Sequence, residues 1–388
     1  NTAIGYLALH HNTTATANTA VGRSALERNT TGISNTAVGF GALDSNTTAD
    51  HNTAVGVGAL GSDTLGQANV AIGSGALQTQ NFTSSTDSYN IGIGRLAGGA
   101  ITTGVRNTII GGLAGDATTT GSYNTFLGFV SGGANTTGES NVALGDDCFA
   151  SNTTGTNNVA IGQATLNFNT TASHNTAVGK SALSANTTGA DNTSIGSASL
   201  AANTTGTLNT ASGSNALRYN TTGSNNTAHG RLALYNNTTA DNNTAVGKSA
   251  LQANTTGHSN VALGGNALDA NTTASNNTAL GYQALTNATT GASNVAVGAN
   301  ASWGNTTGEN NVAVGVTALN ATNTGSDNVG VGYHSLYSNQ SGGANVAIGR
   351  GALYTNTTAD NNTAIGYLSL SANTTGASNV AVGANALQ

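Results

Sequence analysis

The residues of this chain that could carry chemistry are asparagines in repeated Asn-Thr-Thr triplets. Asn followed two residues later by Thr is the acceptor sequence for N-linked glycans in a secreted chain. One hypothesis is therefore a row of glycans on exposed turns. The alternative is that each Asn serves its turn in a left-handed conformation while the threonines stack on one another. The candidate acceptors are Asn12, Asn29, Asn46, Asn135, Asn152, Asn169, Asn186, Asn203, Asn220, Asn237, Asn254, Asn271, Asn305, Asn356 and Asn373.

Histidine and cysteine residues lack the partners that a reactive site needs. His229 occupies an apolar repeat position, one copy after Ser212, and two polar residues stacked inside a roll would hydrogen-bond each other or a water. His51 and His174 fall at ordinary surface positions. Cys148 replaces an Ala and is expected to be a small buried side chain, because a nucleophile would need a positioned base. We expect no catalytic, cofactor-binding or metal-binding residues, no cofactor and no enzymatic activity.

Charged residues are too few to suggest a polyanionic partner. The 388 residues include 9 Lys and Arg and 15 Asp and Glu, which gives a net charge of −6. Without a basic stripe, nucleic acid is not an expected partner. One Cys excludes a disulfide framework, and no apolar run approaches the ~20 residues of a membrane helix. Because the sequence starts and ends inside a repeat, we expect a segment of a longer or processed chain.

A repeat of 17 residues decides the predicted fold. The unit approximates Asn-Thr/Val-Ala-Val/Ile-Gly-x-x-Ala-Leu-x-x-Asn-Thr-Thr-Gly-x-x, and we number its positions 1 to 17 from the first Asn. It occurs in 23 copies, from Asn1 to Asn379, with a single step of 21 residues between Asn69 and Asn90. The Asn at position 1 and the Gly at position 5 occur in every copy, whereas the positions after that Gly vary. Backbone geometry is therefore specified more tightly than surface chemistry.

Alternation within the repeat predicts strands. Positions 2 and 4 share one strand face, and since position 4 is nearly always Val, Ile or Leu, we expect this pair to point inward. Position 8 is always small, and position 9 is Leu in 18 of the 23 copies, which suggests a second strand after the Gly corner. Coils stacked at about 4.8 Å would form a rod on the order of 110 Å long. Few large apolar residues per coil favour lateral association of several chains.

The strings Asn-Val-Ala-Ile-Gly (Asn69 to Gly73, Asn158 to Gly162, Asn345 to Gly349) and Asn-Thr-Ala-Val-Gly resemble the head repeat of YadA-like trimeric autotransporter adhesins. The resemblance spans the whole chain, although this repeat is longer than the typical head repeat. It implies a left-handed parallel β-roll, three chains packed side by side, and an extracellular head that adheres to surfaces. Phage tail-fibre-like proteins carry similar repeats.

Two other solenoid classes share features with this repeat. Threonine rows suggest ice binding, but position 2 freely becomes Val and is expected to point inward. Hexapeptide acyltransferases are left-handed solenoids with 18 residues per coil, whereas this chain has 17. The first class remains an alternative and the second is not expected.

Three copies depart from the consensus. Those starting at Asn90, Asn107 and Asn124 have Gly at position 9 and an apolar residue two places earlier. We interpret them as a sub-register of the same roll, with a kink or partner-docking patch as the alternative. The predicted organisation is one continuous rod, made of solenoid repeats over 1–79, an inserted loop over 80–89, atypical repeats over 90–140 and solenoid repeats over 141–388.

The sequence as a whole predicts an all-β parallel β-solenoid of about 23 coils, at a cell or virion surface or secreted. It would serve as a non-catalytic structural fibre or adhesive rod, as a homo-oligomer such as a trimer. One alternative is an N-glycosylated filament that assembles end to end, and another is an ice- or ligand-binding solenoid. The bound surface or carbohydrate cannot be named from sequence. Outward residues expected to make contacts are Tyr6, Phe40, Tyr282, Tyr333 and Tyr367.

Overall fold

The protein is an all-β parallel solenoid, as the sequence predicts. The computed structural model describes residues 1–321 and 323–388, in which every regular element is a short strand. Among the described residues, no helix has the length and apolarity needed to cross a lipid bilayer. Two compact units, residues 1–192 and 193–388, are described separately.

In residues 1–192 one parallel sheet runs through successive coils. Its strands are β1 (Thr2–Ile4), β2 (Thr19–Val21), β3 (Thr36–Val38), β4 (Thr53–Val55), β6 (Val70–Ile72), β8 (Ile91–Ile93), β9 (Thr108–Ile110), β10 (Thr125–Leu127), β11 (Val142–Leu144), β12 (Val159–Ile161) and β13 (Thr176–Val178). A separate pair of two-residue strands, β5 (Gly66–Gln67) and β7 (Thr86–Asp87), joins the inserted residues to the preceding coil. The insertion is therefore hydrogen-bonded into the coil, and the main register continues across it with Val70 opposite Ile91.

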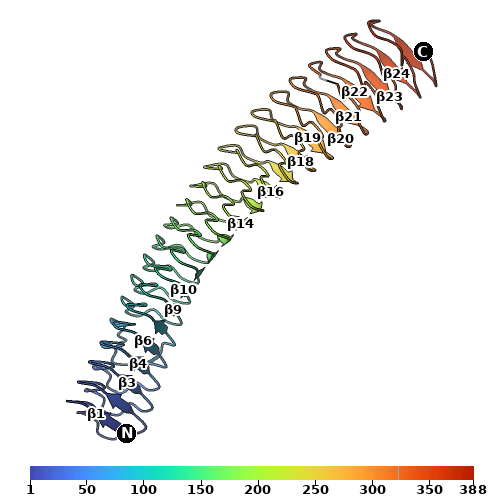
Figure 1. Cartoon of the computed structure of the whole chain (residues 1–388). Coiled ribbons are helices and arrows are strands. Elements are labelled where there is room, and N and C mark those ends of the chain that lie inside the picture. The colour runs from blue at the N-terminus through green and yellow to red at the C-terminus, as the bar shows by residue number, and fades with distance from the viewer. Residues whose placement is uncertain (322) are drawn as a thin grey trace. The chain divides into compact units, whose positions relative to one another are not determined.

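Residues 193–388 repeat this arrangement. The strands are β14 (Thr193–Ile195), β15 (Thr210–Ser212), β16 (Thr227–His229), β17 (Thr244–Val246), β18 (Val261–Leu263), β19 (Thr278–Leu280), β20 (Val295–Val297), β21 (Val312–Val314), β22 (Val329–Val331), β23 (Val346–Ile348), β24 (Thr363–Ile365) and β25 (Val380–Val382). Each strand pairs with the equivalent residues of the next coil, so like stacks on like. In each unit the strands lie side by side along one edge of the coils (Figure 1).

Each coil contains one main-sheet strand, not the two predicted. The second apolar rib, at positions 8 and 9, lies in a turn because the Leu at position 9 has a left-handed backbone, as at Leu26 with φ 51°. Coils still hydrogen-bond there, since Leu26 N–H donates to Ala42 O at 3.0 Å. Loss of the strand therefore does not interrupt backbone pairing between coils.

The strand faces are also reversed relative to the prediction. Position 3, such as Ala20 or Ala37, is completely buried, whereas positions 2 and 4 face outward and are half-buried or exposed. Space at position 3 varies with the neighbouring side chains: most coils hold Ala there, whereas a Cβ added to Gly92 would lie 2.8 Å from Leu77 Cγ. Ala at position 3, a small residue at position 8 and Leu at position 9 together fill the coil.

The atypical coils keep this register, and the two that start at Asn107 and Asn124 exchange large and small side chains within the core. Ile109 and Phe126 occupy position 3 and are fully buried. Position 9 of the same coils is Gly, because that space is already taken: a Cβ on Gly132 would lie 2.7 Å from Phe126 Cδ2. In-register pairing of β8, β9 and β10 shows no shifted register. The atypical coils therefore belong to the same roll, without a shift of register, and differ from the other coils in how they fill the core.

Phe126 and Gly132 should compensate for each other. Phe126→Ala alone should lower the free energy of unfolding by ~3–5 kcal/mol through a cavity. Gly132→Leu alone should cost ~1–3 kcal/mol through overpacking. The double variant restores the Ala and Leu of most coils, so denaturant titration should show a loss well below the sum of the single losses. As a control, Phe126→Ala combined with Gly41→Leu at an outer position should be additive. Additivity of Phe126→Ala and Gly132→Leu would contradict the exchange.

Candidate functional site

The candidate glycosylation residues lie at position 12, where the structure forms a buried ladder of asparagine side chains. All fifteen are buried except Asn12 and Asn373, which are half-buried. Asn46 Nδ2 donates to Asn29 Oδ1 of the preceding coil at 2.8 Å and to the Ala49 carbonyl of its own coil at 3.1 Å. The same pattern recurs through much of each unit. These asparagines therefore bind successive coils to one another.

A second buried ladder runs through the Asn residues of position 1. Asn35 N–H donates to Asn18 Oδ1 at 2.8 Å, and Asn18 Nδ2 donates to Gly32 O at 2.8 Å. Asn29 Nδ2 of the other ladder donates to the same Gly32 carbonyl at 2.9 Å. The two ladders thus meet at position 15, where one carbonyl ties both to the backbone. Each amide thus bonds the backbone of its own coil and also a neighbouring coil.

This packing gives a physical reason against a glycan row. A sugar on Nδ2 would displace two buried hydrogen bonds and would need space that the interior lacks. The threonines do stack, since Thr30 Oγ1 donates to Thr47 O at 3.0 Å. The position-12 asparagines are, however, absent from the residues with left-handed backbone, which instead fall at positions 7, 9 and 17 in most coils. Their role is in the side chain, and glycosylation stays an untested prediction.

The ladder at position 12 is interrupted where Asn is replaced. Asp63 follows Asn46, is 1% exposed, and accepts bonds from Gly66 N–H at 3.0 Å and Gln80 Nε2 at 2.6 Å. It offers no amide, and Asn46 Oδ1 is left buried without a partner. Burial is the largest cause that raises the pKa of Asp63, outweighing these hydrogen bonds. Ala288 follows Asn271 and leaves Asn271 Oδ1 without a partner in the same way.

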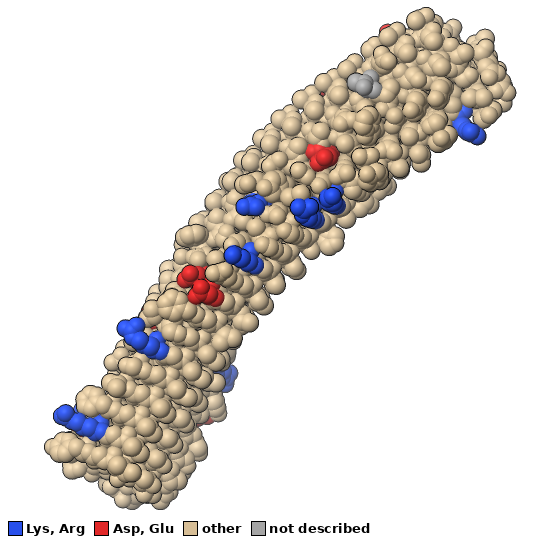
Figure 2. Space-filling model, in the orientation of Figure 1, with Lys and Arg blue, Asp and Glu red and all other residues tan. Residues whose placement is uncertain are grey.

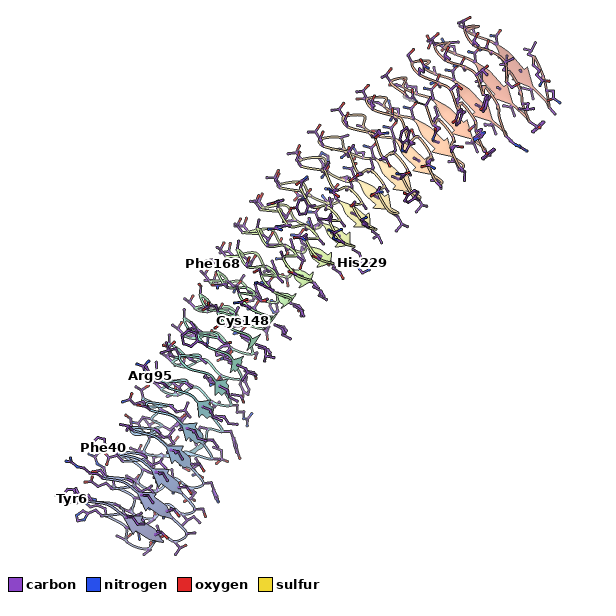
Figure 3. The ribbon with its side chains drawn as sticks, in the orientation of Figure 1. Tyr6, Phe40, Arg95, Cys148, Phe168 and His229 are labelled. Carbon is purple, nitrogen blue, oxygen red and sulfur yellow. The ribbon has the colours of Figure 1, made fainter. Side chains whose placement is uncertain are left out.

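The other residues singled out from sequence are not brought together. His229 and Ser212 pair across β15 and β16, but the predicted interior location of His229 is wrong, because position 4 faces outward (Figure 3). His51 and His174 are exposed, as expected. Cys148 is buried as expected; burial raises the pKa of its thiol to about 12, and Sγ donates to Ala160 O at 3.2 Å. In the described part of the chain, no three His, Cys, Asp or Glu side chains are placed to hold a metal ion.

The outward residues of the main-sheet strands form a surface that we call the strand face. It consists of positions 2 and 4, and none of these strands contains Lys, Arg, Asp or Glu. Leu127 and Ile161 are 41% and 37% exposed in the first unit, and Leu263 and Leu280 are 43% and 41% exposed in the second. In the view of Figure 2, charged residues are sparse and scattered. The strand face is an uncharged strip of Thr, Val, Ile and Leu, interrupted in the second unit by Ser212 and His229.

Aromatic and arginine side chains gather at positions 6 to 11, which we call the turn edge. All five aromatic residues expected to face outward are exposed, and Tyr6, Phe40 and Arg95 project from one edge of the first unit (Figure 3). The arginines between them were not expected from the sequence to take part. Arg23 lies 5.9 Å from the Tyr6 ring centroid and 5.6 Å from that of Phe40, and both distances indicate cation–π contact. The 17-residue spacing of Tyr6, Arg23 and Phe40 was the signal that could have found this stack.

Asp63→Asn should stabilise the protein at neutral pH. Gly66 N–H bonds one carboxylate oxygen of Asp63 and Gln80 Nε2 bonds the other. In the variant the new Nδ2 would supply the donor that Asn46 Oδ1 lacks, and the single Oδ1 would accept from both Gly66 and Gln80, as Asn152 Oδ1 accepts from Gly155 N–H and Asn169 Nδ2. Because the folded-state pKa of Asp63 is raised, its protonated form favours folding, and stability should fall as pH rises from about 4 through that pKa. Denaturant titration should therefore show the variant more stable than wild type by ~1–3 kcal/mol at pH 7, with a smaller difference at about pH 3.5. Asp87→Asn, at an exposed position in the insertion that follows, is the control. An equal gain at both pH values would contradict this assignment.

Ala288→Asn should repair the second interruption. The introduced Nδ2 would donate to Asn271 Oδ1, and the introduced Oδ1 would accept from Asn305 Nδ2, which already bonds Gly308 O at 3.0 Å. Two added buried hydrogen bonds should raise the free energy of unfolding by ~1–3 kcal/mol, measured by denaturant titration. Ala253→Asn, at an outer position where Asn236 occurs naturally, should change it by less than ~0.5 kcal/mol. Loss of stability in Ala288→Asn would show that the interior there cannot hold an amide.

Comparison with known proteins adds no assignment. No protein-family model matches the sequence, and no curated protein matches it. The strand face and the turn edge are therefore the features from which a function can be inferred.

Proposed function

We propose that this chain is a non-catalytic structural solenoid of an extracellular fibre or adhesive head, in which several copies pack laterally through their strand faces. The single observation that carries the proposal is the uncharged, apolar strand face along each unit. Interior ladders satisfy the buried asparagine amides of most coils, so the strand face is the apolar surface left for another molecule. The turn edge would remain outside the assembly, free to contact a surface.

The strand face has the size of a stable interface. In residues 1–192, eleven strands at about 4.8 Å spacing and three residues of about 3.3 Å each give a strip of about 50 by 10 Å. The second unit provides a similar strip. Together they offer about 1,000 Å² per chain, compared with about 800 Å² per partner in a standard interface. The strip of one unit alone, about 500 Å², is already as large as the largest exposed apolar patch of a typical monomer, and such patches are often interaction sites.

A second copy of the same chain is the occupant that the strand face favours. The strand face has no charges with which to select a charged partner. Its rows of side chains have the same spacing as those of a second copy. The resemblance to YadA-like head repeats implies three chains side by side, which would bring three such faces toward one axis. A trimer is therefore the proposed assembly, and an extracellular or virion surface is the proposed location.

Ice binding is the second candidate, because one observation now favours it. One of the two arguments against it, that position 2 points inward, is wrong, because Thr19, Thr36 and Thr53 form an outward ladder. The other argument remains, since position 2 is Val or Ile in several coils. A regular threonine row could match a lattice. Thermal hysteresis measurement distinguishes the two functions, since a lateral interface would bury these threonines and give no hysteresis.

Lateral packing predicts a defined oligomer that charges on the strand face disrupt. At micromolar concentration, light scattering after size exclusion should give the mass of a trimer for the wild type. The variant Leu127→Lys with Ile161→Lys should lose that mass while keeping its far-ultraviolet circular dichroism, because buried lysines without partners are costly at an interface. Gln163→Lys, on the turn edge where Lys180 occurs at the same position, should keep the wild-type mass. A monomeric wild type, or an unchanged mass in the double variant, would overturn the proposal.

A further inference from the structure

A notch on the turn edge of the second unit has the features of a small-molecule site. It has a volume of about 230 Å³ and lies across three coils, starting at Asn328, Asn345 and Asn362. Tyr333 and His334 line it from the first coil, Arg350 and Tyr354 from the second, and Tyr367 from the third. All of these residues belong to positions 6, 7 or 10 of the repeat.

The notch exists because position 7 of its middle coil is Gly351. That residue has φ 67°, whereas the coils on either side carry His334 and Leu368 at position 7. Because Gly351 has no side chain, Leu368 leans into part of that space, where a Cβ added to Gly351 would lie 2.7 Å from Leu368 Cδ2, and the space that remains forms the notch. The other three Gly residues at position 7, Gly41, Gly58 and Gly75, line a cavity of about 320 Å³ in the first unit. Gly at this position therefore marks an opening on the turn edge in both units.

Aromatic rings enclose the notch in the second unit. Tyr333 and His334 are stacked with centroids 3.7 Å apart, and His334 lies 5.8 Å from Tyr354. Tyr354 is itself stacked on Tyr337 at 5.2 Å with rings 5° apart. These contacts hold the rings of Tyr333 and Tyr354 in place and cover part of them. Tyr367 stacks on no described ring and is 48% exposed, so its ring offers a face to a ligand.

The charge in the notch is a single unpaired arginine. Arg350 lies between two rings, 5.7 Å from the centroid of Tyr333 and 5.9 Å from that of Tyr367. None of the lining residues has a carboxylate, and no described residue forms an ion pair with Arg350. Burial and then the charge of Arg350 lower the pKa of His334, which keeps its ring neutral at pH 7. The notch thus attracts one negative charge and disfavours cations.

The polar groups around the notch are free for a polyhydroxylated ligand. No described residue forms a hydrogen bond with the hydroxyls of Tyr333, Tyr354 or Tyr367. A flat aromatic anion would pair Arg350 and cover the rings, but would leave these hydroxyls to water. A pyranose ring with a carboxylate meets all three features, because its C–H face stacks on aromatics, its hydroxyls bond the tyrosines and its carboxylate pairs with arginine.

We propose that the notch between Tyr333, Arg350 and Tyr367, opened by Gly351, binds a single carboxylated sugar ring of the uronic acid type. This inference rests on the proposed adhesive function and names the ligand class of its turn edge. It assigns Arg350 to the carboxylate and the tyrosine rings to the sugar face. No bond is made or broken, so the site is one of recognition only.

The test is ligand titration of the full chain, followed by calorimetry and saturation-transfer NMR. Methyl β-glucuronide should bind the wild type at least tenfold more tightly than methyl β-glucoside, and more tightly than benzoate. Arg350→Gln should abolish the preference for glucuronide over glucoside. Gly351→Asn should weaken glucuronide binding at least tenfold by filling the notch; Asn215, Asn266 and Asn300 show that Asn adopts this backbone at position 7.

Gly41→Asn, which fills the corresponding opening of the first unit, is the matched control and should leave glucuronide binding to the second unit unchanged. Equal affinity for glucuronide and glucoside, tighter binding of benzoate, or unchanged binding in Gly351→Asn would each overturn the proposal. The variant Leu127→Lys with Ile161→Lys separates this site from lateral packing, because it alters the strand face and leaves the notch intact. Glucuronide binding by that variant supports the site whatever its mass, and failure of lateral packing would show in the mass alone.

Discussion

Most coils bury two asparagine side chains, and their amides find partners one coil away. If these amides were buried without hydrogen bonds, the lost free energy would exceed the stabilisation from the few apolar contacts of a single coil. The hydrogen bonds from Asn46 to Asn29 and from Asn35 to Asn18 therefore connect successive repeats. A coil is stable only between neighbours, and its stability is the sum of its own terms and the two interfaces beside it. Replacement of one amide leaves a defect in the adjacent coil, as the unpaired oxygens of Asn46 and Asn271 show.

The same ladders explain why the apolar strand residues face outward. Amides and backbone occupy much of the interior, so the remaining space holds Ala at position 3, a small residue at position 8 and Leu at position 9. Phe126 enters that space only where position 9 is Gly132. Branched residues at positions 2 and 4 are left to pack along the sheet, where each covers part of the next. The core is therefore thin. The branched apolar side chains that would lie in the core of an ordinary domain lie on the outside, where a second chain can cover them.

Period, the Gly corner, the small position 8 and the Leu rib could all be predicted from sequence, because each repeats at constant spacing. The face of the strand that points inward could not be predicted, because alternation shows that two faces differ without showing which one is buried. The more hydrophobic face was assigned to the interior, which is wrong for a core filled largely by amides. The position-12 asparagines were assigned to an exposed turn for a related reason, since Asn in a polar triplet usually lies at the surface. A signal was present nonetheless: Ile101, Ala288 and Gln80 replace this Asn, and apolar replacements such as Ile101 and Ala288 are typical of an interior position. The notch could not be predicted from sequence, because its residues come from three coils.

Position 7 shows how such a fold can acquire binding sites without loss of stability. Its backbone is left-handed in every coil that carries a side chain there, for example at Ser24 and Asn215. Side chains are sterically strained in that conformation, whereas Gly adopts it freely. Replacement by Gly therefore removes an outer side chain and also relieves backbone strain, and it leaves both asparagine ladders unchanged.

The coils on either side then form the walls of the opening, and the side chains at positions 6 and 10 provide its chemical groups. Because adjacent coils share one backbone conformation, a site can arise at any coil through substitution of a few surface residues. The variable positions of the repeat are thus the ones that fold stability leaves free for recognition.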